Sequence, residues 1–217
     1  MLKIENAEVY GWEAAIRGMR NPKNSWDKSD SYFFVTNNEM VIGENDLRLM
    51  ANLSRAGNDH GKFLRMINVT CDITAPLYWW KEYDTYKVGT VANSCSTMHK
   101  IQAKEFEFDD FSHEHLTPES CVALEHVMDC MEANRKIFLA LDGEEAKSAW
   151  WQMIQLLPSS YNQKRTVQLN YQVLKTMYFA RKNHKLDEWH TFCDWILTLP
   201  YSEIITCNCD SVTECDG

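Results

Sequence analysis

The stretch from His60 to Lys100, HGKFLRMINVTCDITAPLYWWKEYDTYKVGTVANSCSTMHK, says most about the fold. Residues 63–73 alternate weakly between apolar and polar side chains and end at Pro76, which predicts a strand. A loop of small polar residues with one lysine, Lys87, follows. Hydroxyls, backbone N–H groups and an ammonium group together suit phosphate oxygens, so an anion pocket is one interpretation. An ordinary polar loop has the same composition and is the other.

The residues before this stretch predict short strands and helices. Residues 3–10 are expected to form a strand and residues 12–19 a helix, followed by a turn-rich loop at 21–25. The aromatic run 32–35 resembles a strand. Apolar residues at helical spacing after residues 43–46 predict another helix that begins at an Asn or Asp cap.

Helices dominate the second half. Thr117-Pro118-Glu119 is a strong start signal, and apolar residues then recur at helical spacing up to Gly143. Further helices are expected at 144–157, 167–178 and 186–199. Because strands come first and helices last, the sequence predicts an α+β fold. No repeat or boundary divides it, so we expect one domain over residues 1–217, with residues 200–217 as a cysteine-containing tail.

Composition limits the possible functions. Lys and Arg number 22 against 31 Asp and Glu, so the formal charge is −9, which argues against binding a nucleic acid polymer. The apolar runs are far shorter than the ~20 residues of a membrane span, and residues 1–6 lack an apolar leader core. We therefore expect a cytoplasmic protein without membrane contact. Motifs of Rossmann, P-loop, zincin and α/β-hydrolase enzymes are missing from the sequence.

The cysteines and histidines do not predict a metal site. Cys207, Cys209 and Cys215 form the one cysteine cluster, and it lacks a clear fourth ligand, so reduced thiols in the tail are expected rather than zinc. Cys121 and Cys130 fall within a helical pattern and are expected to be small core residues. The His113-Glu114-His115 cluster is expected to face solvent.

Two stretches follow the motif order of a known enzyme family. In that family an H-x-x-P-F-E-H-like strand leads to Ala-Pro and then to R-H-R-x-x-S-x-N-x-x-S-x-R-Y. Counting back from Ala75-Pro76 without a gap, His60 falls on the first His. Counting forward with one extra residue, Asn93 and Ser96 fall on the Asn and the second Ser, and the R-H-R triplet becomes Tyr86-Lys87-Val88.

The second stretch lies about 70 residues further on. The family has L-P after a helix, then N-A-R-x-L, and then an Arg on the same helix. These correspond to Leu157-Pro158, to residues 170–174 (NYQVL) and to Arg181. From roughly His60 to Leu199 the chain thus resembles the flavin-dependent thymidylate synthases, with sparse motif identities.

The resemblance implies a mixed β-sheet packed with long helices, and it implies roles for individual residues. His60, Asn170 and Gln172 would lie near the flavin, and a nucleotide's phosphate and base would be held by Lys87, Asn93, Ser94, Ser96 and Arg181. On helical spacing Asn170, Leu174 and Arg181 would share one face. Isolated surface residues are the alternative for each.

FAD is the cofactor that the resemblance implies, but its motif is eroded. The triplet keeps one cation, Lys87, and Gln172 stands where the family has an Arg, so several charge-assisted hydrogen bonds are lost. Lys81, Lys100 or Arg165 could substitute. Trp79 and Trp80 offer stacking faces for a base, with core packing expected for at least one of them.

Three functions remain open. The first is a divergent flavin-dependent methyltransferase acting on deoxyuridylate (dUMP) or a related pyrimidine nucleotide. The second is a catalytically degenerate nucleotide-binding protein of the same fold, such as a phage-type protein that sequesters a nucleotide signal. The third is a structural role without a ligand. Because family members are homotetramers, the resemblance also implies a homo-oligomer.

Overall fold

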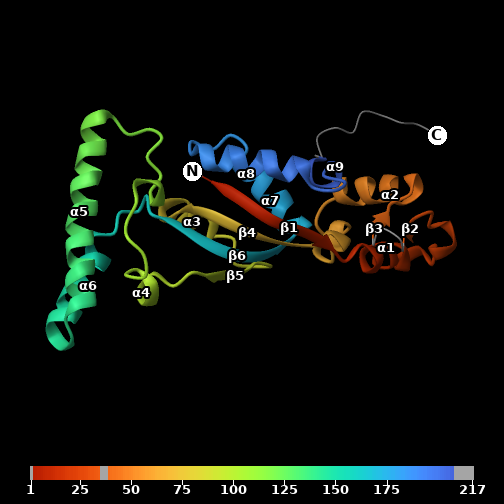
Figure 1. The fold of residues 1–217 in the computed structure, drawn as a ribbon. Helices are drawn as coiled ribbons and strands as arrows, with labels where there is room; N and C mark the ends of the chain where they lie inside the picture. Colours follow the sequence, from red (N-terminus) through yellow and green to blue (C-terminus); the bar gives the residue numbers. More distant parts are fainter. Residues whose placement is uncertain (1, 35–38, 208–217) are drawn as a thin grey trace. The chain divides into compact units, whose positions relative to one another are not determined.

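A computed structural model describes residues 2–34 and 39–207 as a mixture of helices and strands (Figure 1). The predicted α+β class is confirmed. The strands are β1 (Lys3–Tyr10), β2 (Tyr32–Phe34), β3 (Glu39–Val41), β4 (Asn68–Pro76), β5 (Val91–Ser94) and β6 (Asn162–Asn170). The α-helices are α1 (Trp12–Arg20), α2 (Glu44–Arg55), α3 (Leu77–Tyr83), α4 (Thr97–Lys100), α5 (Pro118–Ala140), α6 (Gly143–Leu156), α7 (Tyr171–Arg181), α8 (Asp187–Thr198) and α9 (Glu203–Thr206). Short 3-10 helices are η1 (Asn21–Lys23), η2 (Trp26–Lys28), η3 (Gly61–Arg65) and η4 (Phe108–Asp110).

Four strands form the main sheet in the order β1-β4-β6-β5, and β2 and β3 form a separate antiparallel hairpin. Along β4, every second residue from Val69 to Ala75 is buried while the residues between are half-buried. This alternation follows from the pleat, which points successive side chains to opposite faces.

The chain divides into two compact units. The first consists of residues 1–5, 72–85 and 92–166, and the second of residues 6–71, 86–91 and 167–217. The divisions fall inside strands β1, β4, β5 and β6, so each of these strands contributes residues to both units.

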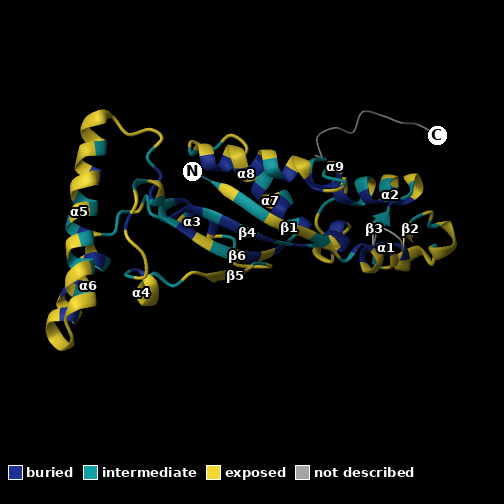
Figure 2. Ribbon diagram, in the orientation of Figure 1, coloured by how far each residue is buried: buried dark blue, intermediate teal, exposed yellow. Residues whose placement is uncertain are grey.

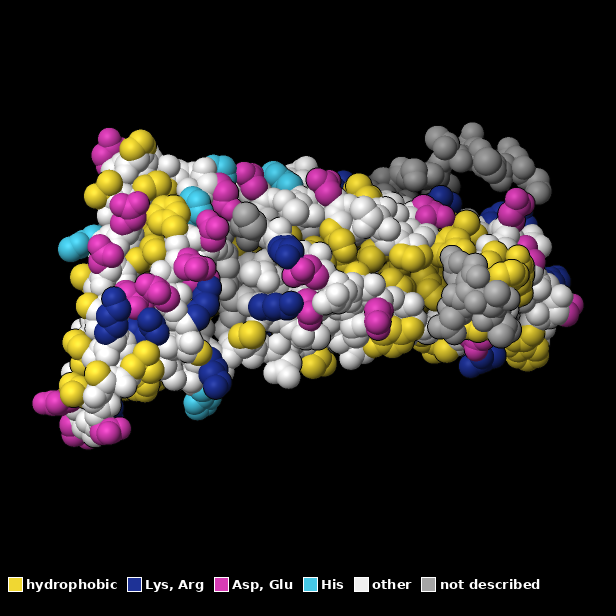
Figure 3. Space-filling model, in the orientation of Figure 1, with side chains coloured by type: hydrophobic (Ala, Val, Ile, Leu, Met, Phe, Trp, Pro, Cys, Tyr) yellow, Lys and Arg dark blue, Asp and Glu magenta, His cyan; other side chains and the backbone are white. Residues whose placement is uncertain are grey.

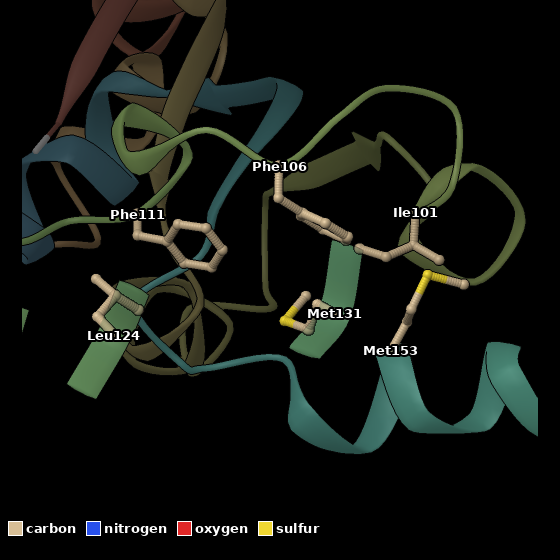
Figure 4. Close-up of a cluster of buried hydrophobic side chains, with 6 residues drawn as sticks. All are labelled: Ile101, Phe106, Phe111, Leu124, Met131 and Met153. Atoms are coloured by element: carbon tan, nitrogen blue, oxygen red, sulfur yellow. The ribbon is translucent and has the colours of Figure 1, made fainter. Parts of the chain in front are cut away.

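Helices α5 and α6 pack as a pair in the first unit (Figure 1). Thr117 caps α5 by accepting a hydrogen bond from the Ser120 N–H at 3.3 Å, and Pro118 occupies the first turn, as the start signal predicts. Much of α5 is exposed (Figure 2). The two helices bury a core of apolar side chains, which Figure 4 shows: Ile101, Phe106, Phe111, Leu124, Met131 and Met153.

The second unit has its own core around α7 and α8. Tyr171, Leu174 and Met177 of α7 are fully buried, as are Trp189 and Phe192 of α8. The Tyr171 hydroxyl donates a 2.6 Å hydrogen bond to the Pro200 carbonyl, which satisfies the polar end of this buried ring.

A buried ion pair joins α1 to α2 in this unit. The Arg20 Nε donates to an Asp46 carboxylate oxygen at 2.6 Å, and both side chains are almost completely buried. The other Asp46 oxygen accepts hydrogen bonds from the hydroxyls of Ser29 and Ser31 at 2.6 and 2.7 Å. Burial raises the pKa of the Asp46 carboxyl, but these bonds and Arg20 outweigh burial, so its pKa lies below its ordinary value.

The structure corrects several predicted elements. Residues 63–65 belong to the 3-10 helix η3, and the strand starts later, at Asn68. Val167 lies in strand β6, so α7 begins only at Tyr171, and this strand falls among the helices. Trp79 and Trp80 lie on helix α3 rather than on a strand, and both are buried.

The start of α2 also differs from the prediction. Gly43 is its N-cap residue, and the capping carboxylate comes from Asp30, 15 residues earlier, which accepts hydrogen bonds from the N–H groups of Asn45 and Asp46. The local spacing of residues predicts where a helix starts. It does not predict a capping side chain that belongs to another segment of the chain.

Other expectations concern surface and tail residues. Cys121 and Cys130 are half-buried rather than core residues. Val35, Cys209 and Cys215 lie outside the described residues. Over residues 2–34 and 39–207, no three His, Cys, Asp or Glu side chains come together as metal ligands would, and every helix is too short or too polar to cross a membrane. Figure 3 shows acidic and basic side chains interspersed on the face in view.

Candidate functional site: helix α7 and the 86–91 loop

Helix α7 begins at a residue that the sequence analysis selected. Asn170 ends strand β6 and caps α7, since its side-chain oxygen accepts a 3.0 Å hydrogen bond from the Val173 N–H. Leu174 is fully buried, whereas Asn170 and Arg181 are half-buried. Asn170 and Arg181 thus mark the two ends of α7, and Leu174 packs into the core between them.

Arg181, the last residue of α7, has a fixed orientation. Its Nε donates a 2.8 Å hydrogen bond to the Tyr86 hydroxyl. The guanidinium carbon lies 4.9 Å from the centre of the Trp189 ring and 5.4 Å from that of Tyr86, within cation–π range. Two aromatic rings and a hydrogen bond thus hold one positive charge in a half-buried place.

The loop 86–91 lies along α7. At Gly89 the backbone φ is +82°, a left-handed conformation that favours glycine. A Cβ at Gly89 would lie 3.0 Å from Asn170 Nδ2 and 3.1 Å from Val173 Cγ2, so the backbone approaches the start of α7 closely. The Thr90 hydroxyl donates to the Tyr86 carbonyl at 2.6 Å and closes the loop on itself.

Loop 86–91 and α7 therefore meet at two places, Tyr86 with Arg181 and Gly89 with Asn170. Lys87 lies between these contacts in the sequence and is exposed. Tyr86 and Gly89, which flank Lys87 in this loop, thus lie next to α7 within this unit.

A second loop, residues 57–61, reaches the first turn of α7. The Gln172 side chain donates a 3.1 Å hydrogen bond to the Asn58 side-chain oxygen. His60 is exposed and its backbone N–H donates to the Gly57 carbonyl at 3.2 Å. A Cβ at Gly61 would lie 3.7 Å from Gln172 Oε1. The structure thus places the segment that carries His60 beside Gln172.

The remaining predicted residues belong to the first compact unit. Asn93 and Ser94 are exposed on β5, and Ser96 caps α4 by accepting a 3.3 Å hydrogen bond from the His99 N–H. Arg165, a candidate substitute cation, already binds Asp84 at 2.9 Å and lies 4.2 Å from the centre of the Trp80 ring. Its guanidinium therefore has a structural role.

Sequence reasoning missed two features of this site. Trp189 is expected only as part of a helix at 186–199, yet its ring also supports Arg181. Gly89 was not selected, although a glycine two residues after the loop lysine is the signal of a left-handed turn.

The polar and charged side chains on α7 and loop 86–91 are those that could hold an anionic ligand. Asn170 and Gln172 are neutral and are already hydrogen-bonded, to Val173 and to Asn58. The loop and helix carry three cations, Lys87, Lys175 and Arg181, and the Lys175 ammonium donates hydrogen bonds to the carbonyl and hydroxyl of Ser54. A flavin dinucleotide carries a doubly charged pyrophosphate in addition to any nucleotide phosphate. Beside α7 the family's R-H-R triplet is reduced to Lys87, and Gln172 stands in place of an Arg, so fewer charge-assisted hydrogen bonds are offered to such a pyrophosphate.

Several solved structures have a fold similar to that of this chain. A crystal structure of the flavin-dependent thymidylate synthase ThyX from Helicobacter pylori with FAD and dUMP matches with a TM-score of 0.65 and 16% identity, over 95% of this chain and 99% of that one. A second structure of the Helicobacter pylori enzyme with FAD and dUMP has a TM-score of 0.65 and 15% identity, over 95% and 97% of the two chains.

A UMP/dUMP methylase, PolB from Streptomyces cacaoi, bound with 5-Br dUMP, matches with a TM-score of 0.60 and 13% identity, over 94% of each chain. No protein-family model matches the sequence, and neither does any curated protein. At these identities the likeness concerns the backbone. The chain therefore has the fold of the flavin-dependent thymidylate synthases and of a UMP/dUMP methylase.

Proposed function

We propose that the chain binds a pyrimidine nucleoside monophosphate of the dUMP type, with its phosphate at Arg181 and Lys87. The observation that carries this proposal is the orientation of Arg181 by Tyr86 and Trp189 at the edge of loop 86–91. An arginine held in this way has lost part of its side-chain entropy before the ligand arrives, so binding costs less. Charge-assisted hydrogen bonds to phosphate are also the strong ones.

The fold supports the choice of a pyrimidine ligand. The Helicobacter pylori structures contain dUMP, and the Streptomyces cacaoi methylase contains 5-Br dUMP. The family resemblance also implies Asn93, Ser94 and Ser96 as ligands, but these residues belong to the other compact unit and are not part of this proposal.

Methyl transfer to the bound nucleotide is the second candidate. The fold favours it, since the similar structures are two of a thymidylate synthase and one of a methylase. His60, Asn170 and Gln172 are then the residues nearest the cofactor. The arginines missing from the flavin motif favour nucleotide binding over methyl transfer. In that case the fold binds and sequesters a nucleotide without the flavin.

A spectrum and a binding panel test both candidates. Nucleotide binding predicts that dUMP, UMP or dTMP raises the melting temperature of the purified protein, whereas no shift with any of the three contradicts it. Flavin-dependent methyl transfer predicts yellow protein with flavin absorbance that survives purification. Colourless protein that takes up no added FAD would contradict flavin-dependent methyl transfer and leave nucleotide binding as the only candidate of the two.

We also propose that the protein self-associates, in the cytoplasm, as a homotetramer. Helix α5 exposes large apolar side chains, with Val122 64% and Leu139 59% exposed. The tetramer itself is what the family resemblance implies, and these exposed side chains are compatible with contact with another copy. Light scattering coupled to gel filtration checks this: a mass of four chains supports the proposal, and a monomer mass at micromolar concentration contradicts it.

A further inference from the structure

A hollow of about 600 Å³ in the second unit is lined almost entirely by basic and neutral polar residues. It lies between η1, η2 and α2, and its lining residues are Arg20, Lys23, Ser25, Lys28, Asn45, Arg48, Leu49 and Asn52. Four of these eight residues are cations and none is acidic. The chain as a whole has a formal charge of −9, whereas the residues that line the hollow carry a net positive charge. The volume lies in the range of small-ligand sites, roughly 300–1,000 Å³.

Arg20 is the fixed element of this hollow. Its exposed fraction is 4%, its Nε is bound to Asp46, and its Nη1 donates to the Ser25 carbonyl at 3.0 Å. A guanidinium has five N–H donors, so these bonds leave others. In the part of the chain that the structure describes, no protein atom accepts from Arg20 Nη2. A nearly buried arginine thus lines the hollow and has N–H groups on Nη2 that no protein atom of the described residues accepts.

The Asp46 carboxylate neutralises Arg20 but not its neighbours. It is fully buried and accepts hydrogen bonds from Ser29, Ser31 and Arg20. Lys23, Lys28 and Arg48 are exposed, and across residues 2–34 and 39–207 no acidic side chain forms an ion pair with any of them. Arg48 does donate a 2.9 Å hydrogen bond to the Asn45 side chain, which positions it at the hollow.

The acidic residues closest in sequence do not line the hollow. The Asp30 carboxylate is occupied by the N–H groups of Asn45 and Asp46 at the start of α2. Asp27 and Glu44 are exposed and do not line the hollow. Three cations that form no ion pair among the described residues, Lys23, Lys28 and Arg48, therefore lie around one hollow.

We infer that this hollow is a second anion site, distinct from the α7 site, and that its ligand is a linear polyphosphate chain. Three cations without ion pairs, beside Arg20, match an anion with several charges better than a single phosphate. Asn45, Asn52 and Ser25 supply neutral hydrogen-bonding groups beside them. Inorganic polyphosphate and a nucleoside triphosphate share this chemistry.

Calorimetric titration of the full chain with inorganic triphosphate at low salt tests the inference. The test variant is Lys23→Ala/Lys28→Ala/Arg48→Gln, which leaves the buried Arg20–Asp46 pair intact. The matched control, Lys136→Ala/Lys147→Ala/Lys185→Gln, removes the same charge elsewhere. We expect the wild type and the control to bind equally and the test variant to bind at least tenfold more weakly. An Arg181→Ala variant should bind triphosphate as the wild type does.

Two results overturn the inference: wild-type protein that gives no binding heat, or a test variant that binds as tightly as the control. Loss of triphosphate binding in Arg181→Ala would also overturn it, by assigning the phosphate chain to the α7 site. ATP as a second titrant separates the two sources. Equal affinity for ATP and triphosphate would show that the site recognises only the phosphate chain. Tighter binding of ATP would show that the ligand is a nucleoside triphosphate.

Discussion

The Nε of Arg181 and the hydroxyl of Tyr86 are joined by a 2.8 Å hydrogen bond across 95 residues of sequence. This bond connects the end of helix α7 to the first residue of loop 86–91. Because Gly89 contacts the other end of the same helix, the loop is positioned at both ends of α7. The proposed phosphate site depends on this double attachment.

Replacing Tyr86 by Phe tests the role of the hydroxyl. Phenylalanine keeps the ring beside the guanidinium and removes only the hydrogen bond to Arg181. We expect a stability loss of about 1 kcal/mol and a several-fold lower affinity for dUMP, because Arg181 loses part of its orientation. Denaturant unfolding and calorimetry measure the two effects. Unchanged dUMP affinity would show that Tyr86 does not position Arg181 for the ligand.

Replacing Gly89 by Ala tests the close approach of the loop to α7. Alanine in a left-handed conformation costs ~1–2 kcal/mol, and here its Cβ also meets Asn170 and Val173. Gly57→Ala is the control, since Gly57 also has a positive φ, +98°, but nothing lies within 4 Å of its Cβ. We expect Gly89→Ala to lower dUMP affinity and stability more than Gly57→Ala. Equal effects of the two substitutions would mean that the contact with Asn170 does not matter.

The pKa of Asp46 gives a pH-dependent prediction. Its folded-state pKa is lowered, so its contribution to stability is present above an unfolded pKa of ~3.9 and is lost as the pH falls through the folded value. Asp46→Asn should destabilise the protein by ~3–5 kcal/mol at pH 7, because Arg20 stays buried without its partner. The difference between wild type and variant should shrink below about pH 4.

Denaturant unfolding from pH 7 to pH 3 measures that difference. The control is Asp30→Asn, which removes the charge of an exposed capping carboxylate and should cost about 1 kcal/mol. A gap between wild type and Asp46→Asn that stays constant over this range would contradict the assignment.

Cys193 should resist alkylation. Burial raises the pKa of its thiol to about 11, so roughly 0.1% is ionised at pH 8, and its exposed fraction is 4%. Cys95 is exposed. With iodoacetamide at pH 8, peptide mass spectrometry should find Cys95 modified well before Cys193. Modification of both at the same rate would contradict the buried position of Cys193.

The sequence predicted the parts of the fold that depend on local spacing. Thr117-Pro118 begins α5 as expected, and β1 has the predicted bounds, because caps and apolar periodicity act within a few residues. The strand β6 was missed because an apolar residue such as Val167 fits both a strand and a helix when only spacing is considered.

The candidate site was predictable only in part. Arg181 and Lys87 were selected by a motif order, and the structure brings their segments together. Contacts that join distant segments, such as Asp30 with the start of α2 or Trp189 with Arg181, leave no mark in local spacing. They arise from tertiary packing, which one sequence does not display.

Calorimetric titration of wild-type and Arg181→Ala protein with dUMP and with deoxyuridine, which lacks the phosphate, tests the central claim most directly. A lost charge-assisted contact of ~1.5–3 kcal/mol predicts that Arg181→Ala binds dUMP ~10–100-fold more weakly. Deoxyuridine, which has no charge for Arg181 to bind, should show equal affinity for both proteins, and an Arg17→Ala control should behave as the wild type. An Arg181→Ala variant that keeps full dUMP affinity, or loses both ligands equally, would contradict the claim that Arg181 holds the nucleotide phosphate.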